Sequence, residues 1–417
     1  MPKTFHGHIN AVVYGGDGLM HHNGQTVFIP NAVTGEEVTY QMTDKKRGVR
    51  RGEVTEILTP AQDRTDAPCM VANTCGGCAL QFMSLAAQAN LKTSWVFDAF
   101  KPFITDTTEF TPLEKHDLGF AGRRRVRWFR DGNKLGFRQR FSHDVIHSET
   151  CIALTETLDT LRQELEKMTL PPSVVSIQAV ELSNGIHIIL ESEYDVPNDF
   201  TPANAENQQW WWRKLDSPSI KPLHKPVLTL FDSIDLQPFI SETLNIQIGA
   251  NDFVQGHQQG NQALISQILG WCKGSKRVVD LFSGCGNLSL PIAAALDAAV
   301  VGAELNPASV KAANNNAKQL QLHASYQTLD LFGKFDFEPF IGADTLILDP
   351  PRKGAKRICQ HIHQLFPKQI IMVNCDIAAG ARDAKALSDA GFKLKALLPL
   401  DLFPYTGHVE TLSLWVS

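Results

Sequence analysis

A single cysteine ends an apolar run near the C-terminus of this 417-residue chain. The run Ile370–Val373 has the composition of a buried strand, and Asn374, Cys375 and Asp376 follow it. Open α/β sheets bind their ligands at the carboxyl ends of the strands. A thiol at that edge is a candidate nucleophile, although it can also be a small core residue next to a turn.

Addition to carbon-6 of a pyrimidine ring is the chemistry that needs such a thiol. Carbon-5 is not nucleophilic enough to take a methyl group unaided, and a thiolate on carbon-6 creates an enolate that is. A base must then remove the carbon-5 proton before the thiol leaves. Glu410, at the start of the last apolar run, is the candidate base, and His408 lies two residues before it.

A glycine loop upstream could hold the methyl donor. Residues 278–290 read VVDLFSGCGNLSL, in which Gly284 and Gly286 follow a strand and open a helix. Glycines let the backbone approach a ligand closely, and Glu304, at the next strand end, can bind a ribose diol. The third glycine of a dinucleotide fingerprint is missing. The loop therefore fits S-adenosylmethionine methyltransferases, and a tight turn without a ligand is the alternative.

Asp349 ends another apolar run and is followed by two prolines. Prolines stiffen a loop and hold nearby carbonyls and carboxylates in place. Methyltransferases that modify amino groups carry an aromatic residue after the prolines, which stacks the target base. Arg352 stands there in this chain, so methylation of an exocyclic amine is disfavoured.

Three kinds of segment must position these groups. From about Gln262 onward apolar strand candidates alternate with helix candidates, as in a parallel sheet covered on both faces. Residues 1–60 read as short strands with glycine turns, which favours a small β-barrel of the kind used on nucleic acid. Residues 61–245 mix strands and helices. We expect an α/β chain with three domains, at 1–60, 61–245 and 246–417.

Four of the eight cysteines could form one metal centre. They are Cys69, Cys75, Cys78 and, after a further 72 residues, Cys151. Four thiolates can hold an iron–sulfur cluster or zinc, although structural zinc sites more often show two C-x-x-C pairs and this chain has one. A redox dithiol would sit at a helix start in a βαβ unit, and a β-barrel precedes this pair.

Local basic surface is needed for any contact with nucleic acid, because the formal net charge is −5. Residues 122–140 hold eight arginines or lysines against one acid, with aromatic residues between them. At strand spacing Arg123, Arg125 and Arg127 share one face. Arginine binds phosphate and aromatics stack bases, so RNA binding is favoured over a solvated charged face. A second basic cluster spans residues 45–51. The tryptophans 210–212 are interpreted as a strand or packing surface.

Together these segments resemble the RNA uracil-5-methyltransferase family. The matching motifs are, in order, DLFSGCGNLSL, LILDPPRKGA, VNCDIAAGARD and LFPYTGHVETL. Within the family the chain is most similar to the branch that modifies uridine in large-subunit ribosomal RNA. That branch carries an N-terminal TRAM domain, an OB-like β-barrel, and an iron–sulfur cluster. Residues 9–38 resemble the TRAM pattern, and CMVANTCGGC resembles the cluster segment.

The resemblance implies a role for each matched residue. It implies Cys375 as nucleophile, Glu410 as general base and Asp349 as the active-site aspartate. It implies a Rossmann-like C-terminal domain whose S-adenosylmethionine is held by Gln255, Phe282, Gly284, Asn287, Glu304, Asp330 and Asp349. It implies a 4Fe–4S cluster on Cys69, Cys75, Cys78 and Cys151 of a central α+β domain.

Two departures from the family pattern bear on activity. The family usually has Ser-Cys-Asn-Pro around the nucleophile, and residues 374–377 here read Asn-Cys-Asp-Ile. A carboxylate beside the thiol raises its pKa unless Asp376 is paired or points away. The family also usually has Phe-x-Gln-Val-Asn where this chain has Phe-Val-Gln-Gly-His, so Gly256 and His257 change the floor of the base pocket.

We therefore expect a cytoplasmic, monomeric enzyme that methylates carbon-5 of a uridine in an RNA loop, most simply of 23S rRNA. No apolar stretch is long enough to span a membrane, and the N-terminus is not a signal peptide. The alternatives are the same reaction on tRNA, cytosine-5 methylation, and an inactive RNA-binding paralogue. Cytosine enzymes usually use a Pro-Cys nucleophile, and Pro68-Cys69 lies far upstream. A pure binding protein would need neither Cys375 nor Glu410.

Overall fold

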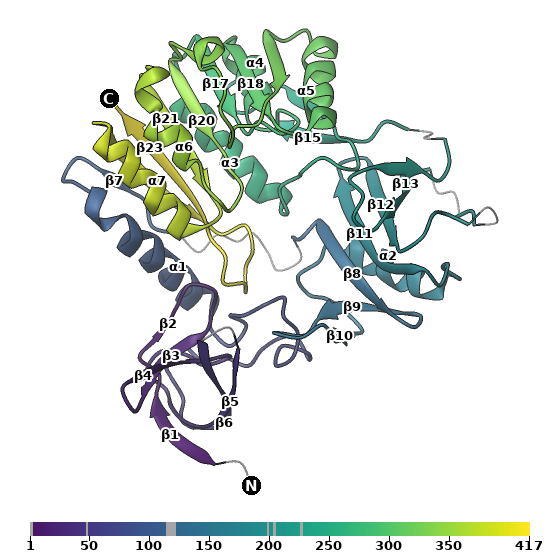
Figure 1. Cartoon of the computed structure of the whole chain (residues 1–417), viewed down its shortest axis with the longest axis vertical. Coiled ribbons are helices and arrows are strands. Elements are labelled where there is room, and N and C mark those ends of the chain that lie inside the picture. The colour runs from purple at the N-terminus through teal and green to yellow at the C-terminus, as the bar shows by residue number, and fades with distance from the viewer. Residues whose placement is uncertain (1–2, 47–48, 114–121, 198–199, 203–205, 226–227) are drawn as a thin grey trace.

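The computed structural model describes residues 3–46, 49–113, 122–197, 200–202, 206–225 and 228–417. A β-barrel, a central sheet and a large α/β domain follow one another along the chain (Figure 1). The side chains of residues 44–48, which include part of the second basic cluster, lie outside the described part. No described helix is both long and apolar enough to cross a membrane.

The N-terminal six-stranded sheet has the order β1-β5-β6-β4-β3-β2. It is a curled half-barrel whose interior holds Ile9, Met20, Val27, Ile29, Val38 and Tyr40. Asn23 and Gly24 both have positive φ and turn β3 into β4, as tight hairpins require. Its strands are β1 Thr4–His8, β2 Ala11–Val12, β3 Gly18–His22, β4 Gln25–Ile29, β5 Glu37–Lys46 and β6 Val49–Thr59. The expected small β-barrel is confirmed.

The central seven-stranded sheet has the order β10-β9-β8-β11-β12-β13-β14 and packs against α2 (Glu156–Lys167). Trp210 and Trp212 are buried in its core, and the Trp211 indole nitrogen donates to His187 Nδ1 at 3.0 Å. The tryptophan run is therefore a packing strand, as expected. The strands are β8 Arg125–Asp131, β9 Lys134–Arg138, β10 Val145–Ile146, β11 Val174–Leu182, β12 Gly185–Ser192, β13 Gln208–Lys214 and β14 Ile220–Pro222.

The C-terminal eight-stranded sheet has the order β19-β18-β17-β20-β21-β23-β22-β7. Strands β17 to β21 are parallel, and β23 runs antiparallel between β21 and β22, which confirms the doubly wound α/β fold. The strands are β17 Arg277–Leu281, β18 Ala299–Glu304, β19 Ala324–Thr328, β20 Thr345–Leu348, β21 Gln369–Asn374, β22 Lys393–Leu400 and β23 Glu410–Val416. The helices are α3 Gln258–Trp271, α4 Ser289–Leu296, α5 Pro307–Gln319, α6 Lys356–Gln360 and α7 Ile377–Asp389, with short 3₁₀ turns at Glu338–Phe340 and Ile362–Gln364.

Two segments outside residues 246–417 also pack onto this domain. Helix α1 (Leu85–Phe100) buries Val96 and Phe100 in its core and continues through the 3₁₀ turn Lys101–Phe103 to β7 (Glu109–Phe110), which pairs with β22. The hairpin of β15 (Phe231–Asp235) and β16 (Thr243–Gln247) packs against α3 in the other half of the core. Chain order alone does not reveal these long-range contacts, which blur the boundary expected at residue 246.

Candidate active site

The candidate catalytic groups lie at one edge of the C-terminal sheet. Cys375 follows the end of β21, and Asp349 follows the end of the neighbouring parallel strand β20. Glu410 begins β23, which runs antiparallel to β21 and therefore starts where β21 ends. The strand order thus brings the three sequence-predicted groups together, close enough for Glu410 and Asp349 to influence the Cys375 thiol.

The thiol is held in its protonated form. Burial, together with the negative charges of Glu410 and Asp349 and against the opposing effect of Arg352, raises the pKa of Cys375 to about 11. Asp376, the neighbour expected to disturb the thiol, instead caps α7, where its Oδ1 accepts from the Ala379 amide at 2.8 Å. The Asn374 side chain packs against Gly380 of the same helix. Asp376 therefore has a local partner, whereas Asn374 Oδ1 is buried without a hydrogen-bond partner among the described residues.

Both acids have raised pKa values. Burial raises the pKa of Glu410 to about 7, against the opposing effect of Arg352. Burial, together with Glu410 and Asp280, raises the pKa of Asp349 well above its usual value. Each acid therefore holds its proton more tightly than an exposed carboxyl group does, and can accept a proton when ionised or donate a hydrogen bond when protonated.

Arg352 is a site residue whose role the sequence analysis missed. It lowers the pKa of Cys375, Glu410 and His408, which places its guanidinium among the candidate catalytic groups. The signal was its position three residues after Asp349, which we used only to disfavour amine substrates. A cation at this point favours the thiolate over the thiol.

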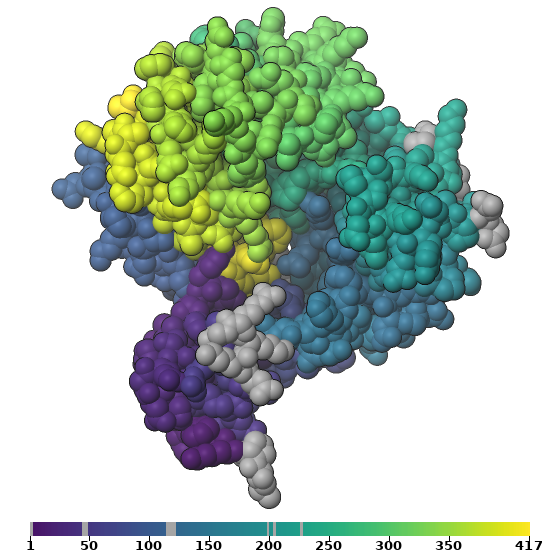
Figure 2. All heavy atoms as spheres, in the orientation of Figure 1, coloured from purple at the N-terminus to yellow at the C-terminus, as the bar shows by residue number. Residues whose placement is uncertain are grey.

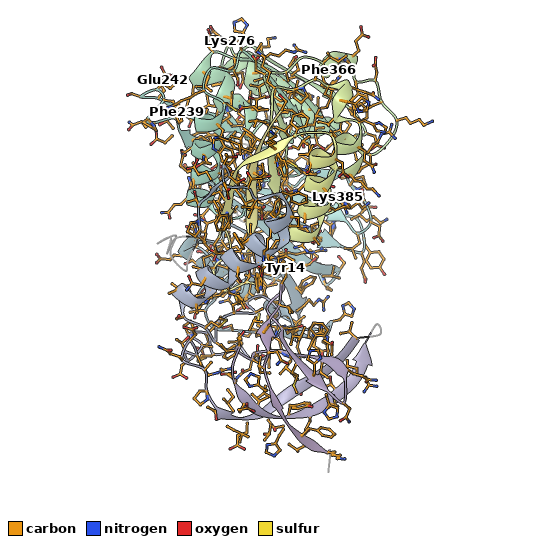
Figure 3. All side chains as sticks on the ribbon, turned by 90° about the vertical axis from the view of Figure 1, so that its left-hand side faces the viewer. Tyr14, Phe239, Glu242, Lys276, Phe366 and Lys385 are labelled. Carbon is orange, nitrogen blue, oxygen red and sulfur yellow. The ribbon has the colours of Figure 1, made fainter. Side chains whose placement is uncertain are left out.

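Tyr14 reaches the site from the N-terminal barrel. Its hydroxyl donates to the Cys375 carbonyl oxygen at 3.1 Å, and its ring lies edge-on to Trp95, 5.8 Å between centroids. The Trp95 indole in turn donates to the Val12 carbonyl oxygen at 3.0 Å. Figure 3 shows Tyr14 where the barrel meets the domains above it. Mainly because of burial, the Tyr14 pKa is raised to about 12, so the hydroxyl remains a donor.

The loop before β23 fits tightly against the barrel. A Cβ at Gly407 would lie 2.3 Å from the Gly15 carbonyl carbon, so this approach requires glycine. In the space-filling view residues near the C-terminus touch the upper edge of the barrel (Figure 2). Lys92, fully buried in α1, anchors the start of this loop through Asp401, 2.7 Å from its Nζ. The barrel therefore supports the segment that leads into Glu410.

The second departure from the family pattern, at Gly256 and His257, also has a structural reason. A side chain at Gly256 would lie 2.5 Å from the Phe403 ring, so glycine leaves room for that phenylalanine. His257 is buried and caps α3, where its Nδ1 accepts from the Gly260 amide at 3.1 Å.

The candidate donor site surrounds the turn between β17 and α4. Gly284 and Gly286 both have positive φ, and a Cβ at Gly284 would meet nothing within 4 Å, so there is open space beside the loop. The Glu304 carboxylate accepts from the Gly284 amide at 3.2 Å and from the Asn306 amide at 2.8 Å. These bonds fix the acid beside the glycine loop, as a ribose-binding group requires.

Two buried polar atoms near this loop have no partner within the described residues. They are Asp280 Oδ1 and Ser283 Oγ. Buried polar atoms are nearly always hydrogen-bonded, so unpaired ones beside an open loop indicate a polar ligand. The other oxygen of Asp280 accepts from Ser289 Oγ at 2.5 Å. A nucleoside with a charged amino-acid tail, such as S-adenosylmethionine, fits this donor and acceptor set.

The remaining predicted donor-binding residues differ in placement. Phe282 packs against Phe332, 5.5 Å between ring centroids, and Asp330 accepts from the Phe332 amide at 3.0 Å, so these lie together. Gln255 is buried, and its carbonyl oxygen accepts from Arg124 Nε at 3.0 Å. Asn287 is instead occupied by a mutual amide pair with Asn261, at 2.8 and 3.0 Å.

The four predicted cluster ligands are neighbours. Burial raises the pKa of Cys75, Cys78 and Cys151. The charge of Cys69 also raises the pKa of Cys75, and the charge of Cys151 also raises the pKa of Cys78. Arg123 lowers the pKa of all three. Among the residues that the structure describes, no three His, Cys, Asp or Glu side chains lie close enough together to hold a metal ion. The thiolate donor set fits an iron–sulfur cluster, but the side chains do not form a coordination shell.

The three predicted RNA-binding arginines alternate with the buried side chains of Arg124 and Val126, but they have different neighbours. Arg125 and Arg127 alternate with buried residues on β8, and Arg125 lies over the Phe253 ring at 5.0 Å. Arg127 Nε pairs with Glu191 at 2.7 Å. Arg123 precedes the strand and lies near the cysteines, over the Phe403 ring at 5.6 Å. The strand begins two residues later than its spacing implied.

Comparison with known proteins gives full-length relatives. The sequence model of a family described as tRNA (Uracil-5-)-methyltransferase matches residues 234–416. The 23S rRNA (uracil(1939)-C(5))-methyltransferase RlmD of Shewanella halifaxensis (strain HAW-EB4) is 30% identical over 96% of this chain and 93% of its own. The protein of the same name from Shewanella sp. (strain MR-7) is 31% identical with the same coverage.

A solved structure shares the whole fold. The Pyrococcus abyssi tRNA (uracil-54, C5)-methyltransferase in complex with S-adenosyl-L-homocysteine matches with a TM-score of 0.74 and 19% identity. The match covers 99% of this chain and 100% of that one. It shows that the barrel, the central sheet and the C-terminal domain together form a known architecture.

Proposed function

The chain belongs to the RNA uracil-5-methyltransferase family, and from this premise we propose that it transfers a methyl group from S-adenosylmethionine to carbon-5 of a uridine in 23S rRNA. The observation that carries the proposal is the meeting of Cys375, Glu410 and Asp349 at one sheet edge. We assign RNA binding to the barrel of residues 1–60 and to the central domain, and catalysis to the C-terminal domain.

Cys375 acts as the nucleophile in this proposal. Its sulfur forms a bond to uracil carbon-6, its proton leaves to solvent, and the electron pair of the ring double bond moves towards oxygen-4. Since the pKa of the Cys375 thiol in the folded protein is about 11, the reaction depends on groups that favour the thiolate. Arg352 is the group that does so here.

Asp349 stabilises the enolate. Burial raises its pKa well above the usual value and so favours the protonated acid, which would donate a hydrogen bond to a uracil carbonyl oxygen. Such a donor, fixed in a buried site, stabilises the charge that develops on that oxygen.

Glu410 acts as the base. Glu304, Phe282 and Asp330, with Gln255 nearby, would hold S-adenosylmethionine at the glycine loop. When bound, it would supply an electrophilic methyl group for carbon-5, with cleavage of the methyl–sulfonium bond and release of S-adenosylhomocysteine. Glu410 then takes the carbon-5 proton, the carbon-6–sulfur bond breaks, and the ring double bond returns. A pKa of about 7 makes this carboxylate a base that is still available near neutral pH.

We further propose that Cys69, Cys75, Cys78 and Cys151 hold a 4Fe–4S cluster. Four thiolates are the usual ligands of such a cluster, and the positive charge of Arg123 would offset its negative charge. The cluster would tie the segment after the barrel to Cys151 of the central domain. It takes no part in methyl transfer.

The choice of 23S rRNA is supported by the relatives, which are named for that substrate. The RNA must present the uridine unstacked, because the reactive face is closed inside a helix. Arg125, with the Phe253 ring beneath it, and Arg127 are the proposed phosphate-contacting residues on the central sheet.

A methylation assay on separated RNAs tests this function. Ribosomal RNA and tRNA from a strain lacking the gene are each incubated with the protein and methyl-labelled S-adenosylmethionine, then digested to nucleosides. We expect label in 5-methyluridine from 23S rRNA. Label in tRNA alone would show that tRNA, and not 23S rRNA, is the substrate. Label in 5-methylcytidine would overturn the proposed reaction.

A further inference from the structure

A cavity of about 600 Å³ lies where four parts of the chain meet. The barrel, the cysteine segment, the central sheet and the loop before β23 all contribute to its wall. The lining residues that matter here are Tyr14, Asp17, Arg51, Arg138, Phe141 and His408. Its volume lies within the range of sites that hold one small organic ligand. Neither Cys375 nor the glycine loop at Gly284 and Gly286 is among its lining residues.

The wall of the cavity carries an excess of positive charge. Arg51, Arg138 and Arg140 line it against one carboxylate, Asp17, which pairs with Arg51 at 2.5 Å and Arg140 at 3.5 Å. Each guanidinium has five N–H donors, so donors remain after these pairs are made. An anionic ligand such as a phosphate group matches this wall.

The cavity also has an aromatic surface. Phe141 is 48% exposed, and the Arg51 guanidinium lies over its ring at 3.9 Å. Phe137 also lines the cavity, next to Arg138 in the chain. Aromatic rings next to arginines form the stacking platforms on which proteins hold unpaired bases.

Two lining residues connect the cavity to the catalytic groups. Tyr14 lines it and also donates to the Cys375 carbonyl oxygen at 3.1 Å. His408 lines it and lies two residues before Glu410. Arg352 influences the pKa of both residues. The cavity is therefore separated from the nucleophile by little more than one side chain.

We propose that this cavity binds a nucleotide adjoining the target uridine, with its base on Phe141 and its phosphate against Arg51 and Arg138. The inference rests on the proposed function in one respect, that the substrate is RNA. It adds a second recognition point beside the reacting base, so that the enzyme reads the strand next to the uridine as well as the uridine. The strand must be single and splayed, because only then can two neighbouring bases occupy separate pockets.

A cycle of protein and RNA changes tests this subsite. The RNA is a hairpin copied from the sequence around the methylated uridine, intact or with an abasic nucleotide at one position. Phe141→Ala is compared with Phe366→Ala, since Phe366 is also an exposed phenylalanine with positive φ, on the catalytic domain well away from Tyr14 (Figure 3). Binding is measured by fluorescence anisotropy, and kcat/KM by methyl transfer.

We expect Phe141→Ala to weaken binding of intact RNA about tenfold, as loss of one stacked base does, and Phe366→Ala to change nothing. With the abasic nucleotide adjoining the target, Phe141→Ala should cause no further loss. If Phe141→Ala weakens binding by the same further factor whichever nucleotide is abasic, the proposed subsite is wrong. Arg138→Gln, run as a second variant, should give the same position-dependent pattern if Phe141→Ala does not fold. Wild-type protein that binds the hairpin without forming 5-methyluridine would refute the proposed function while leaving the binding cycle readable.

Discussion

Replacing Glu410 by glutamine should remove activity and raise stability at alkaline pH. The pKa of this buried acid is raised from 4.5 to about 7, so the folded protein holds a proton there that the unfolded chain has released. Between these two values stability falls as pH rises, since the native state binds more protons than the unfolded state. At about 1.4 kcal/mol per tenfold step in proton affinity, the cost of the buried carboxylate above pH 7 is about 3 kcal/mol.

Glutamine has no proton to lose and nearly the same shape. Glu410→Gln should therefore match the wild type in stability below pH 4.5 and exceed it by up to about 3 kcal/mol at pH 8. The attraction of Arg352 for the carboxylate is already included in the pKa of about 7. Methyl transfer by the wild type should rise with pH through about 7, as the carboxylate forms.

Urea unfolding at pH 4, 6 and 8 measures the effect, with Glu56→Gln as the control because Glu56 is an exposed strand glutamate. The control should shift stability equally at each pH. If Glu410→Gln is no more stable than the wild type at pH 8, or gains equally at pH 4, the account of a buried base is wrong.

Three further changes test other parts of the site. Asp349→Asn should lower kcat about tenfold or more while leaving affinity for the methyl donor little changed, since an amide donates a weaker hydrogen bond than a neutral carboxylic acid does. A variant as active as the wild type at every pH from 5 to 8 would contradict a role for the acid proton. Tyr14→Phe should slow both alkylation of Cys375 and methyl transfer by a few-fold, as loss of one hydrogen bond does. Tyr40→Phe removes a barrel hydroxyl that is bonded to His22 and should slow neither. Cys78→Ser should remove the brown colour and bound iron of anaerobically purified protein and lower its unfolding temperature; a wild-type protein without iron that remains fully active would count against the cluster.

The strand-end rule accounts for what could be predicted at the catalytic centre. Cys375, Asp349 and Glu410 each stand at the end or start of an apolar run, and a doubly wound sheet brings such positions to one edge. The glycine loop and Glu304 follow the same logic. These predictions needed only local patterns and one general rule of topology.

What could not be predicted depends on contacts between distant segments. Tyr14 meets Cys375 across 361 residues, and nothing in the barrel sequence marks it as a neighbour of the proposed nucleophile. The different neighbours of Arg123 and Arg125, the Phe403 and Phe253 rings, also come from distant segments that strand spacing does not reveal. Helix α1 joins the catalytic domain because its apolar face fits α7 and β22, which no periodicity could show.

The central claim is that Cys375 attacks uracil. RNA carrying 5-fluorouridine at the target position tests it most directly, because fluorine at carbon-5 cannot be removed by the base and the adduct persists. The protein is incubated with this RNA and S-adenosylmethionine and digested, and the peptide that carries a nucleotide is identified by mass spectrometry. We predict one adduct, on the peptide containing Cys375, and none with Cys375→Ala. An adduct on another cysteine, or methylation of ordinary RNA by Cys375→Ala, would contradict the account.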